Sequence, residues 1–139
     1  PVLRYRTHDL TRVVTEKCSC GRTHARMQKV RARCDDMLII RGTNVFPSQV
    51  EDVLAGIEGV TPHYLIVVDN ETGLDRMTVN VELKPEAFSD SFEVMDNFRQ
   101  MVAEKLKGTL LVGVKVKLVE PGGIERSTGK TKHVRDLRK

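Results

Sequence analysis

The spacing of the apolar residues changes period along residues 37–118, and this pattern limits the possible folds more than any other feature of the sequence. Apolar side chains recur every three to four residues over 48–57 and over 90–107, and so predict two amphipathic helices. Residues 77–83 alternate strictly between apolar and polar, as a half-buried strand does. Shorter apolar runs predict further strands at 37–40, 64–68 and 114–118.

The predicted order of elements is therefore strand, helix, strand, strand, helix, strand. This order predicts an α+β fold of the ferredoxin-like β-α-β-β-α-β type, with an antiparallel sheet and two helices on one face. The first helix has Pro47 in its first turn, and Ser48 and Glu51 have the spacing of a capping box. We expect the second helix to end at Gly108, because glycine is a poor helix former.

Two further segments flank this domain. Short apolar runs near Val13 and Met27, joined by a polar loop, predict a small N-terminal β-hairpin followed by a hinge. The stretch 121–129 is too polar for a core and predicts a loop, which leads into the basic tail 130–139. A length of 139 residues favours one main core.

The net charge of +4 is unevenly distributed along the chain. Residues 1–41 carry ten basic and four acidic side chains, residues 42–119 carry seven and twelve, and residues 120–139 carry six and three. An anionic partner is therefore expected to meet the flanking segments and not the acidic body. With four Phe, two Tyr and no Trp, the chain has few aromatic residues for stacking nucleic-acid bases.

The cysteine content and the length of the apolar runs indicate in which cellular compartment the protein works. The apolar runs are far shorter than the roughly 20 residues that span a bilayer, so no membrane partner is predicted. An odd number of three cysteines argues against a disulfide framework and favours a cytoplasmic location. Cys18, Cys20 and His24 are candidate zinc ligands, although zinc needs four; the alternative is thiols in a surface loop.

Lys130 is a further candidate, but it belongs to no complete motif that composition or spacing can identify. The run from Thr128 to Thr131 is similar to the end of a phosphate loop, but Gly122 lies seven residues before Gly129 and not five. What remains is Lys130 on an exposed loop, which either contacts a phosphate or a carboxylate or is simply solvated.

Acidic residues near the start of the chain allow more than one interpretation. Asp35 and Asp36 follow Arg33 in a charge cluster that fits a metal or catalytic site and fits equally a turn between two subdomains. Asp9, taken alone, is typical of a turn.

Four motifs, in this order, resemble the C-terminal motifs of acyl-adenylate-forming ligases, most closely those of the phenylacetate-CoA ligase subfamily. They are Tyr5-Arg6-Thr7-His8-Asp9-Leu10, Arg33-Cys34-Asp35-Asp36-Met37, Arg41-Gly42-Thr43-Asn44-Val45-Phe46-Pro47-Ser48 and Ser127-Thr128-Gly129-Lys130. The resemblance covers essentially the whole chain. It implies that residues 1–34 end an N-terminal, ATP-binding domain and that residues 35–139 form a mobile lid domain.

The resemblance also implies the roles of individual residues. Asp9 aligns with the acid that hydrogen-bonds the ribose hydroxyls, Arg33 with the arginine at the ribose and phosphate, and Asp35 with the hinge. Two departures accompany these matches: His8 stands where the broad family has glycine, and Asn44 where related ligases often have arginine.

The resemblance also implies residues that act in the two steps of the reaction, formation of the acyl-adenylate and transfer of the acyl group to coenzyme A. Lys130 aligns with the lysine that contacts the acyl carboxylate and the α-phosphate during adenylate formation. Rotation about the hinge then withdraws Lys130 and presents the loop with Arg41 and Gly42 to coenzyme A.

The implied cofactors are ATP with Mg²⁺, bound mainly by the N-terminal domain of the same polypeptide, and coenzyme A. The implied substrate is an aryl acid, phenylacetate, and the isolated chain is expected to be inactive. Zinc at Cys18, Cys20 and His24 and a homodimer are left open. The alternative function is a ferredoxin-like module that binds a small molecule or RNA.

Overall fold

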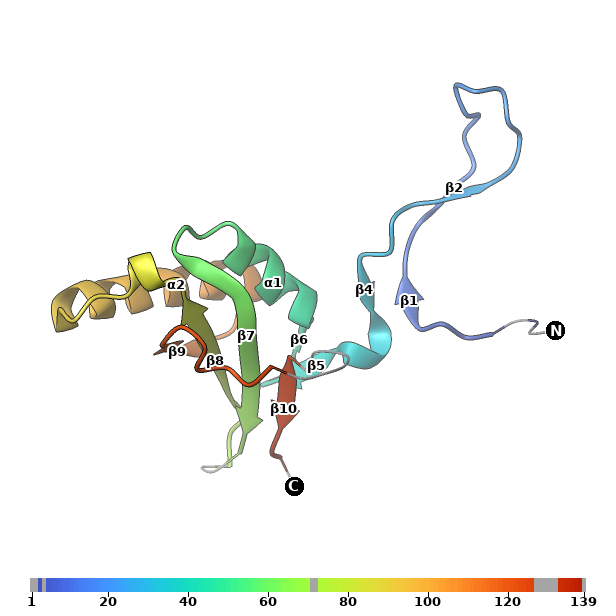
Figure 1. The fold of residues 1–139 in the computed structure, drawn as a ribbon. Coiled ribbons are helices and arrows are strands. Elements are labelled where there is room, and N and C mark those ends of the chain that lie inside the picture. Colours follow the sequence, from blue (N-terminus) through green and yellow to red (C-terminus); the bar gives the residue numbers. More distant parts are fainter. Residues whose placement is uncertain (1–2, 4, 71–72, 127–132, 139) are drawn as a thin grey trace. The chain divides into compact units, whose positions relative to one another are not determined.

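The structure, a computed structural model, describes residues 3, 5–70, 73–126 and 133–138 (Figure 1). The chain divides into two compact units, Pro1–Met37 and Leu38–Lys139. Each unit has its own pattern of strand pairing and is described separately below.

The first unit is a long, irregular β-hairpin. Its elements are β1 (Asp9–Leu10), β2 (Val13–Val14), β3 (Arg26–Met27), β4 (Ala32–Arg33) and the 3-10 helix η1 (Cys34–Asp36). β1 pairs with β4 and β2 pairs with β3, both antiparallel, so the hairpin predicted near Val13 and Met27 is present. Among its described residues no side chain is buried, and the unit therefore has no apolar core of its own.

The second unit combines two helices with a four-stranded mixed sheet. Its elements are β5 (Leu38–Ile40), β6 (Thr43–Val45), α1 (Pro47–Ala55), β7 (Val60–Asp69), β8 (Arg76–Leu83), η2 (Pro85–Ala87), α2 (Phe92–Leu110), β9 (Val114–Val119) and β10 (Val134–Asp136). The strand order in the sheet is β10-β7-β8-β9. β7 and β8 are antiparallel, whereas β10 runs parallel to β7 and β9 parallel to β8. The predicted α+β class is confirmed.

The predicted ferredoxin-like sheet is wrong in two respects. β5 does not join the sheet but pairs with β6, because the two-residue turn at Arg41 and Gly42 folds the chain back on itself. β8 and β9, which that topology would separate by β5, are therefore direct neighbours, and strands joined by a helical crossover run parallel. The second difference is β10, which comes from the predicted basic tail and occupies one edge of the sheet.

The start of α1 also differs from the sequence-based expectation. The helix begins at Pro47, so Ser48 and Glu51 do not form the predicted capping box. Instead, the backbone N–H of Phe46 donates to Oε1 of Gln49 (2.9 Å), and the N–H of Gln49 donates to the carbonyl oxygen of Phe46 (2.9 Å).

Gly108 does not end the second helix, which continues to Leu110. A glycine in a helix costs about 1 kcal/mol relative to alanine, whereas burying a leucine side chain contributes roughly 1.5–3 kcal/mol. Leu110 is 3% exposed, so continuing the helix by two residues is favourable overall. The helix is terminated by the next residue, Leu111, whose φ of 58° is left-handed.

The core of the second unit lies between the sheet and the two helices, which pack on each other (Figure 1). α1 also packs against β7, and α2 against β9. The sheet and both helices supply its apolar side chains, among them Val50, Leu54, Tyr64, Ile66, Val68, Met77, Val79, Val81, Val102 and Leu106. The predicted periods of 3.6 and 2 residues thus mark the buried faces. Within the described part of the chain, no helix is long and apolar enough to cross a membrane.

Candidate functional site

The two residues expected at the nucleotide are brought together by strand pairing. Asp9 in β1 and Arg33 in β4 are direct partners in the antiparallel register, and both are exposed. Side chains at such positions lie on the same face of a ladder, about 5 Å apart at Cβ. A carboxylate acceptor and a guanidinium donor are therefore presented side by side, as a ligand with hydroxyl and phosphate groups requires.

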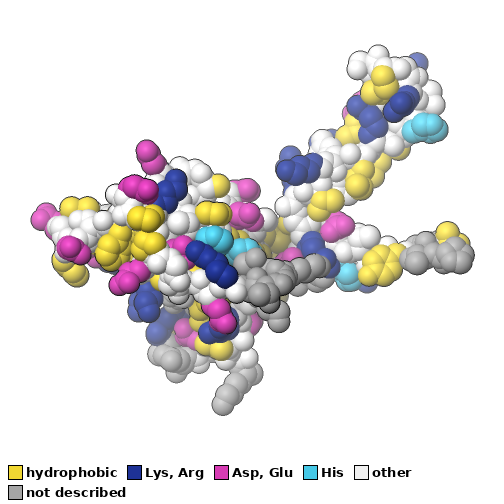
Figure 2. All heavy atoms as spheres, viewed as in Figure 1, with side chains coloured by type: hydrophobic (Ala, Val, Ile, Leu, Met, Phe, Trp, Pro, Cys, Tyr) yellow, Lys and Arg dark blue, Asp and Glu magenta, His cyan; other side chains and the backbone are white. Residues whose placement is uncertain are grey.

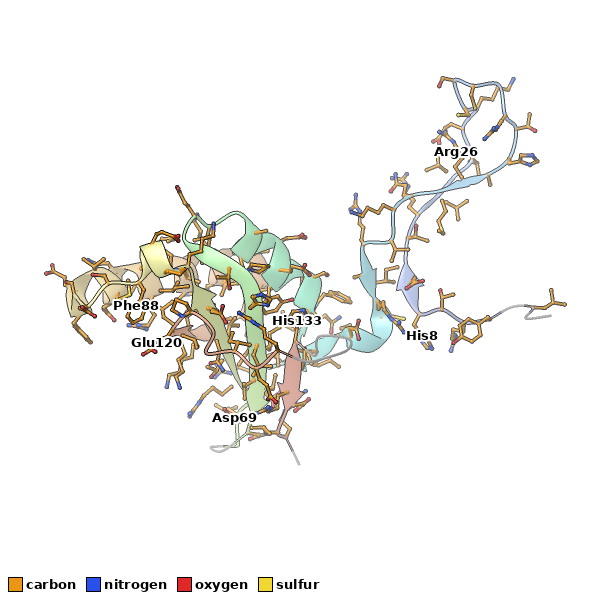
Figure 3. All side chains as sticks on the ribbon, in the orientation of Figure 1. His8, Arg26, Asp69, Phe88, Glu120 and His133 are labelled. Carbon is orange, nitrogen blue, oxygen red and sulfur yellow. The ribbon has the colours of Figure 1, made fainter. Side chains whose placement is uncertain are left out.

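His8 fixes the backbone immediately before this pair. Its φ is 64°, in the left-handed region that glycine adopts most easily, which accounts for the glycine expected here from the resemblance. The carbonyl oxygen of His8 accepts a hydrogen bond from the N–H of Cys34 (2.7 Å), and its Nδ1 lies 3.6 Å from the Cys34 Sγ. The β1–β4 ladder therefore continues to the first residue of η1, and His8 is labelled there in Figure 3.

The expected hinge residue, Asp35, lies in η1 (Cys34–Asp36). This single turn ends just before Leu38, where the second unit begins. The domain boundary expected from the family resemblance lies between residues 34 and 35, whereas the structure divides the two units between Met37 and Leu38.

Arg41 and Gly42, expected to face coenzyme A, form the turn between β5 and β6. Their φ values are 49° and 79°, and two successive positive values define a type I′ hairpin turn. The Nε of Arg41 donates to the carbonyl oxygen of Asp75 (2.8 Å), which ties the turn to the start of the β8 segment. Apart from the two chain neighbours of Gly42, no described atom lies within 4 Å of a Cβ placed on it, so the turn is open to a ligand.

Cys18, Cys20 and His24 do not assemble a metal site. The two sulfur atoms are 3.1 Å apart, but the described residues contain no group of three His, Cys, Asp or Glu side chains that could hold a metal ion. The backbone N–H and the thiol of Cys20 lower the pKa of the Cys18 thiol. The loop thus supplies two adjacent thiols, and a zinc ion here would require ligands from another segment.

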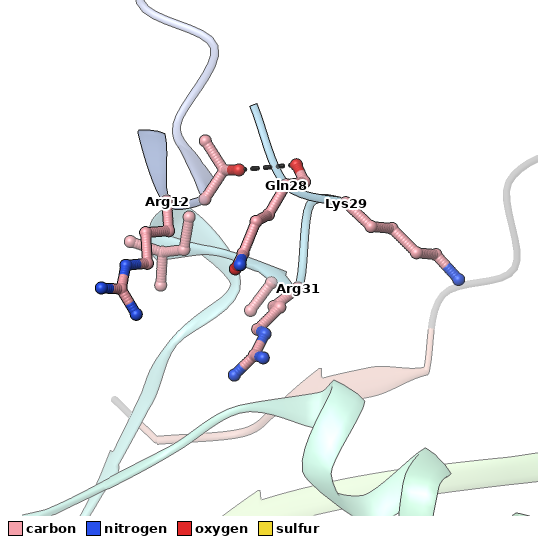
Figure 4. A pocket seen from close by; sticks show the side chains of 7 residues that line it. Arg12, Gln28, Lys29 and Arg31 are labelled. Atoms are coloured by element: carbon pink, nitrogen blue, oxygen red, sulfur yellow. Dashed lines mark hydrogen bonds between the residues drawn. The ribbon is translucent and has the colours of Figure 1, made fainter. Parts of the chain in front are cut away.

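A hollow of about 350 Å³ lies along the first unit, and three of its seven lining residues are basic (Figure 4). Arg12, Lys29 and Arg31 contribute its charges, and no side-chain hydrogen bond or ion pair joins them to another described residue. The hydroxyl of Thr11 donates to the carbonyl oxygen of Gln28 (2.7 Å) and connects the two strands beside it. Lys and Arg side chains are spread along this unit among exposed apolar ones (Figure 2).

Lys130, the expected catalytic residue, lies outside the described residues, but the structure describes both flanks of its segment. On the N-terminal flank, the loop that follows β9 contacts Glu82. The Arg126 guanidinium lies 2.7 Å from Oε1 of Glu82, and the N–H of Ile124 donates to Oε2 (3.3 Å). The loop is thereby attached to β8.

On the C-terminal flank, His133 packs against β7 (Figure 3). Its ring stacks on Tyr64 with centroids 4.3 Å apart and an interplanar angle of 15°. The N–H of Ile66 donates to the His133 carbonyl oxygen (2.7 Å), and pairing of β10 with β7 begins at the next residue. Burial, followed by the charges of Glu51 and Asp52, raises the pKa of Tyr64, so its phenol is neutral and donates to the carbonyl oxygen of Pro47 (3.3 Å).

Sequence reasoning missed Glu82. Its position alternates with the core residues Val81 and Leu83, which predicts a solvent-exposed side chain. In the structure it is 2% exposed, because the loop that follows β9 contacts this face of β8. Burial favours a higher pKa for Glu82, but hydrogen bonds from Arg126, Gly122 and Ile124 outweigh this effect and lower the pKa.

Comparison with known proteins adds independent findings. The family described as AMP-binding enzyme C-terminal domain matches residues 42–138. Over its full length the chain is 46% identical to phenylacetate-coenzyme A ligase of Thermus thermophilus, and over 99% of its length it is 41% identical to phenylacetate-coenzyme A ligase of Escherichia coli. The chain spans 34% and 31% of these two relatives, about a third of their length.

A solved 2-hydroxyisobutyryl-CoA ligase is similar in fold. In the postadenylation state with 2-HIB-AMP, its structure matches 94% of this chain at a TM-score of 0.79 and 30% identity. In the thioesterification state with 2-HIB-AMP and CoA, it matches 95% at a TM-score of 0.70 and 31% identity. This chain covers 28% of that protein in both cases.

Proposed function

Because the chain belongs to the family of AMP-binding enzyme C-terminal domains, we propose that it is the C-terminal part of an ATP-dependent phenylacetate-CoA ligase. The proposed reaction converts an aryl acid, ATP and coenzyme A into acyl-CoA, AMP and pyrophosphate through an acyl-adenylate. The observation that carries this proposal is the cross-strand placement of Asp9 and Arg33, which pairs the acceptor and the donor needed at one nucleotide.

In the proposed first half-reaction, Asp9 accepts hydrogen bonds from the ribose hydroxyls and Arg33 donates to phosphate oxygens. The carboxylate of the acid attacks the α-phosphorus and pyrophosphate leaves. Negative charge accumulates on the non-bridging oxygens in this step, and the ammonium of Lys130 stabilises it without transferring a proton. We assign the Mg²⁺ that accompanies ATP mainly to the N-terminal domain of the same polypeptide, as the family resemblance implies.

In the proposed second half-reaction, the lid rotates at Asp35 and withdraws Lys130. The turn at Arg41 and Gly42 then faces coenzyme A, whose thiolate attacks the acyl carbonyl carbon and displaces AMP. The exposed type I′ turn supports this role, because a glycine without close neighbours allows a ligand to approach the backbone.

We assign residues 1–34 to the end of the N-terminal domain and residues 35–139 to the lid. The first unit supports this assignment because its apolar side chains are exposed: Val13 is 63% exposed and Met27 is 67% exposed. Such residues need a partner surface, which the preceding domain of the same polypeptide would provide. The requirement for ATP and coenzyme A is consistent with the cytoplasmic setting expected from the sequence.

The test uses the full-length enzyme and separates the half-reactions. Lys130→Ala is expected to slow adenylate formation, measured by pyrophosphate release, by roughly 10²–10³-fold. Thioester formation from preformed phenylacetyl-adenylate and coenzyme A should remain within about twofold of wild type. Equal loss of both steps, or an unchanged first step, would refute the proposed role of Lys130.

A further inference from the structure

Glu82 is the single buried charged side chain among the described residues. A carboxylate removed from water is strongly unfavourable unless several donors surround it. Glu82 therefore requires donors, and the loop that supplies them must keep its position for the carboxylate to remain satisfied.

Most of these donors come from one short loop. Arg126 forms the ion pair of 2.7 Å, Ile124 donates its backbone N–H, and the N–H of Gly122 also contributes to lowering the Glu82 pKa. The hydroxyl of Thr61 in β7 lies 3.4 Å from Oε1 and completes the set. A single carboxylate thus holds the loop through hydrogen bonds from two of its residues, Ile124 and Arg126.

The loop conformation is suited to this contact. The N–H of Gly123 donates to the carbonyl oxygen of Glu120 (2.9 Å), and Gly122 has a φ of 80°. With Pro121 before it, this is the pattern of a type II turn. A Cβ on Gly123 would lie 2.5 Å from Cγ1 of Val119, so the turn packs closely against the end of β9.

The segment with Lys130 begins immediately after Arg126 and ends at His133, which is held by stacking on Tyr64. Six residues therefore connect two attachments on one sheet, Glu82 in β8 and Tyr64 in β7. The N-terminal attachment depends on the charge of Glu82, whereas the C-terminal one depends on strand pairing and stacking.

We propose that Glu82 is a positioning residue for adenylate formation: through Arg126 and Ile124 it fixes the start of the segment from which Lys130 reaches the nucleotide. This inference rests on the proposed function of Lys130. A displacement of a catalytic group by about 1 Å can cost on the order of 10²-fold in rate, so loss of the attachment affects the first half-reaction. Thioester formation does not depend on this attachment, because Lys130 is withdrawn from the site in that step.

The test is Glu82→Gln in the full-length enzyme. Glutamine keeps the size of the side chain but removes the negative charge that pairs with Arg126. The rate of adenylate formation is expected to fall by roughly 10–100-fold, mainly in kcat and with little change in KM for ATP. The rate of thioester formation from preformed adenylate should stay within about twofold of wild type.

A second variant, Arg126→Met, removes the other partner of this ion pair, whose side chain is 48% exposed. It should reproduce the selective loss, and the double variant should lose little more than either single one. Arg126→Lys, which keeps a cation, should restore part of the rate. The matched control is Asp96→Asn, which breaks the half-exposed 2.6 Å ion pair with Arg99 on α2 and should leave both half-reactions unchanged.

The outcomes separate this inference from the proposed function. If Lys130→Ala abolishes adenylate formation while Glu82→Gln and Arg126→Met leave it unchanged, the positioning role is refuted and the proposed function stands. If both contact variants slow the two half-reactions equally, Glu82 acts through general stability and the inference is again refuted. If Lys130→Ala leaves adenylate formation intact, the proposed function and the positioning role fail together.

Discussion

Asp9 and Arg33 are direct cross-strand partners, although the whole of the first hairpin separates them in the sequence. The pairing places the two residues on one face of the β1–β4 ladder. Neither residue needs the second unit to reach this arrangement, because both strands belong to the first unit. The proposed nucleotide contacts of this pair can therefore be altered without changing the fold of the second unit.

Asp9→Ala in the full-length enzyme is expected to weaken ATP binding. A hydrogen bond to a charged group contributes roughly 1.5–3 kcal/mol, so KM for ATP in adenylate formation should rise at least about tenfold. Pyrophosphate release at varied ATP concentrations measures the change. Glu16→Ala, which removes an exposed acid from the same hairpin, is the matched control, and an equal rise there would point to a nonspecific effect of charge.

Stability should depend on pH through Glu82. The pKa of this carboxyl in the folded state is below its ordinary value of 4.5, so the unfolded chain takes up the proton first as the pH falls. The stabilisation is therefore fully present above about pH 4.5 and is lost as the pH drops through the lower, folded pKa.

Urea unfolding of the wild type and Glu82→Gln measures this effect. The difference in unfolding free energy between the two proteins should be constant from pH 7 to pH 5.5 and should shrink below about pH 4.5. A difference that grows on acidification would contradict the assigned direction of the pKa shift.

Two glycines should respond to alanine substitution with opposite signs. Gly42→Ala forces a Cβ into a φ of 79° in the type I′ turn and should lower the unfolding free energy by about 1–2 kcal/mol. Gly108→Ala lies inside α2, where the new Cβ would have no described atom within 4 Å apart from its chain neighbours and the nearby backbone of the helix itself. Because alanine is the better helix former, this variant should gain about 0.5–1 kcal/mol. Thermal unfolding of both variants tests the pair.

Arg41→Ala should affect the opposite half-reaction from Lys130→Ala. It removes a cation from the turn expected to face coenzyme A, together with its hydrogen bond to the carbonyl oxygen of Asp75. KM for coenzyme A in thioester formation should rise by roughly tenfold, the loss of one charge-assisted contact, while pyrophosphate release stays unchanged. Lys115→Ala, an exposed cation on β9, should alter neither step. A loss confined to adenylate formation would contradict the assignment of Arg41.

Most elements of the second unit could be predicted from local patterns. Alternation at Met77, Val79 and Val81 identified both β8 and its buried face, because side chains of a strand alternate between two faces regardless of the partner strand. The helical period likewise marked Val102 and Leu106, which are fully buried. The motifs at Asp9, Arg33, Arg41 and Lys130 provided the candidate site residues through a family resemblance, without giving their positions relative to one another.

Strand pairing and the burial of Glu82 could not be obtained in this way. The apolar run 38–40 has the same period whether it joins the main sheet or pairs with β6, and only the left-handed turn at Arg41 and Gly42 decides between these outcomes. Glu82 occupies a position that alternation assigns to solvent, and a loop some forty residues later in the sequence buries it. Periodicity reflects the geometry of a single element, and it therefore determined the helices, the strands and their buried faces. Which strands pair, and which segments bury each face of the sheet, depend on contacts between residues far apart in the sequence. Only the tertiary structure decided these contacts.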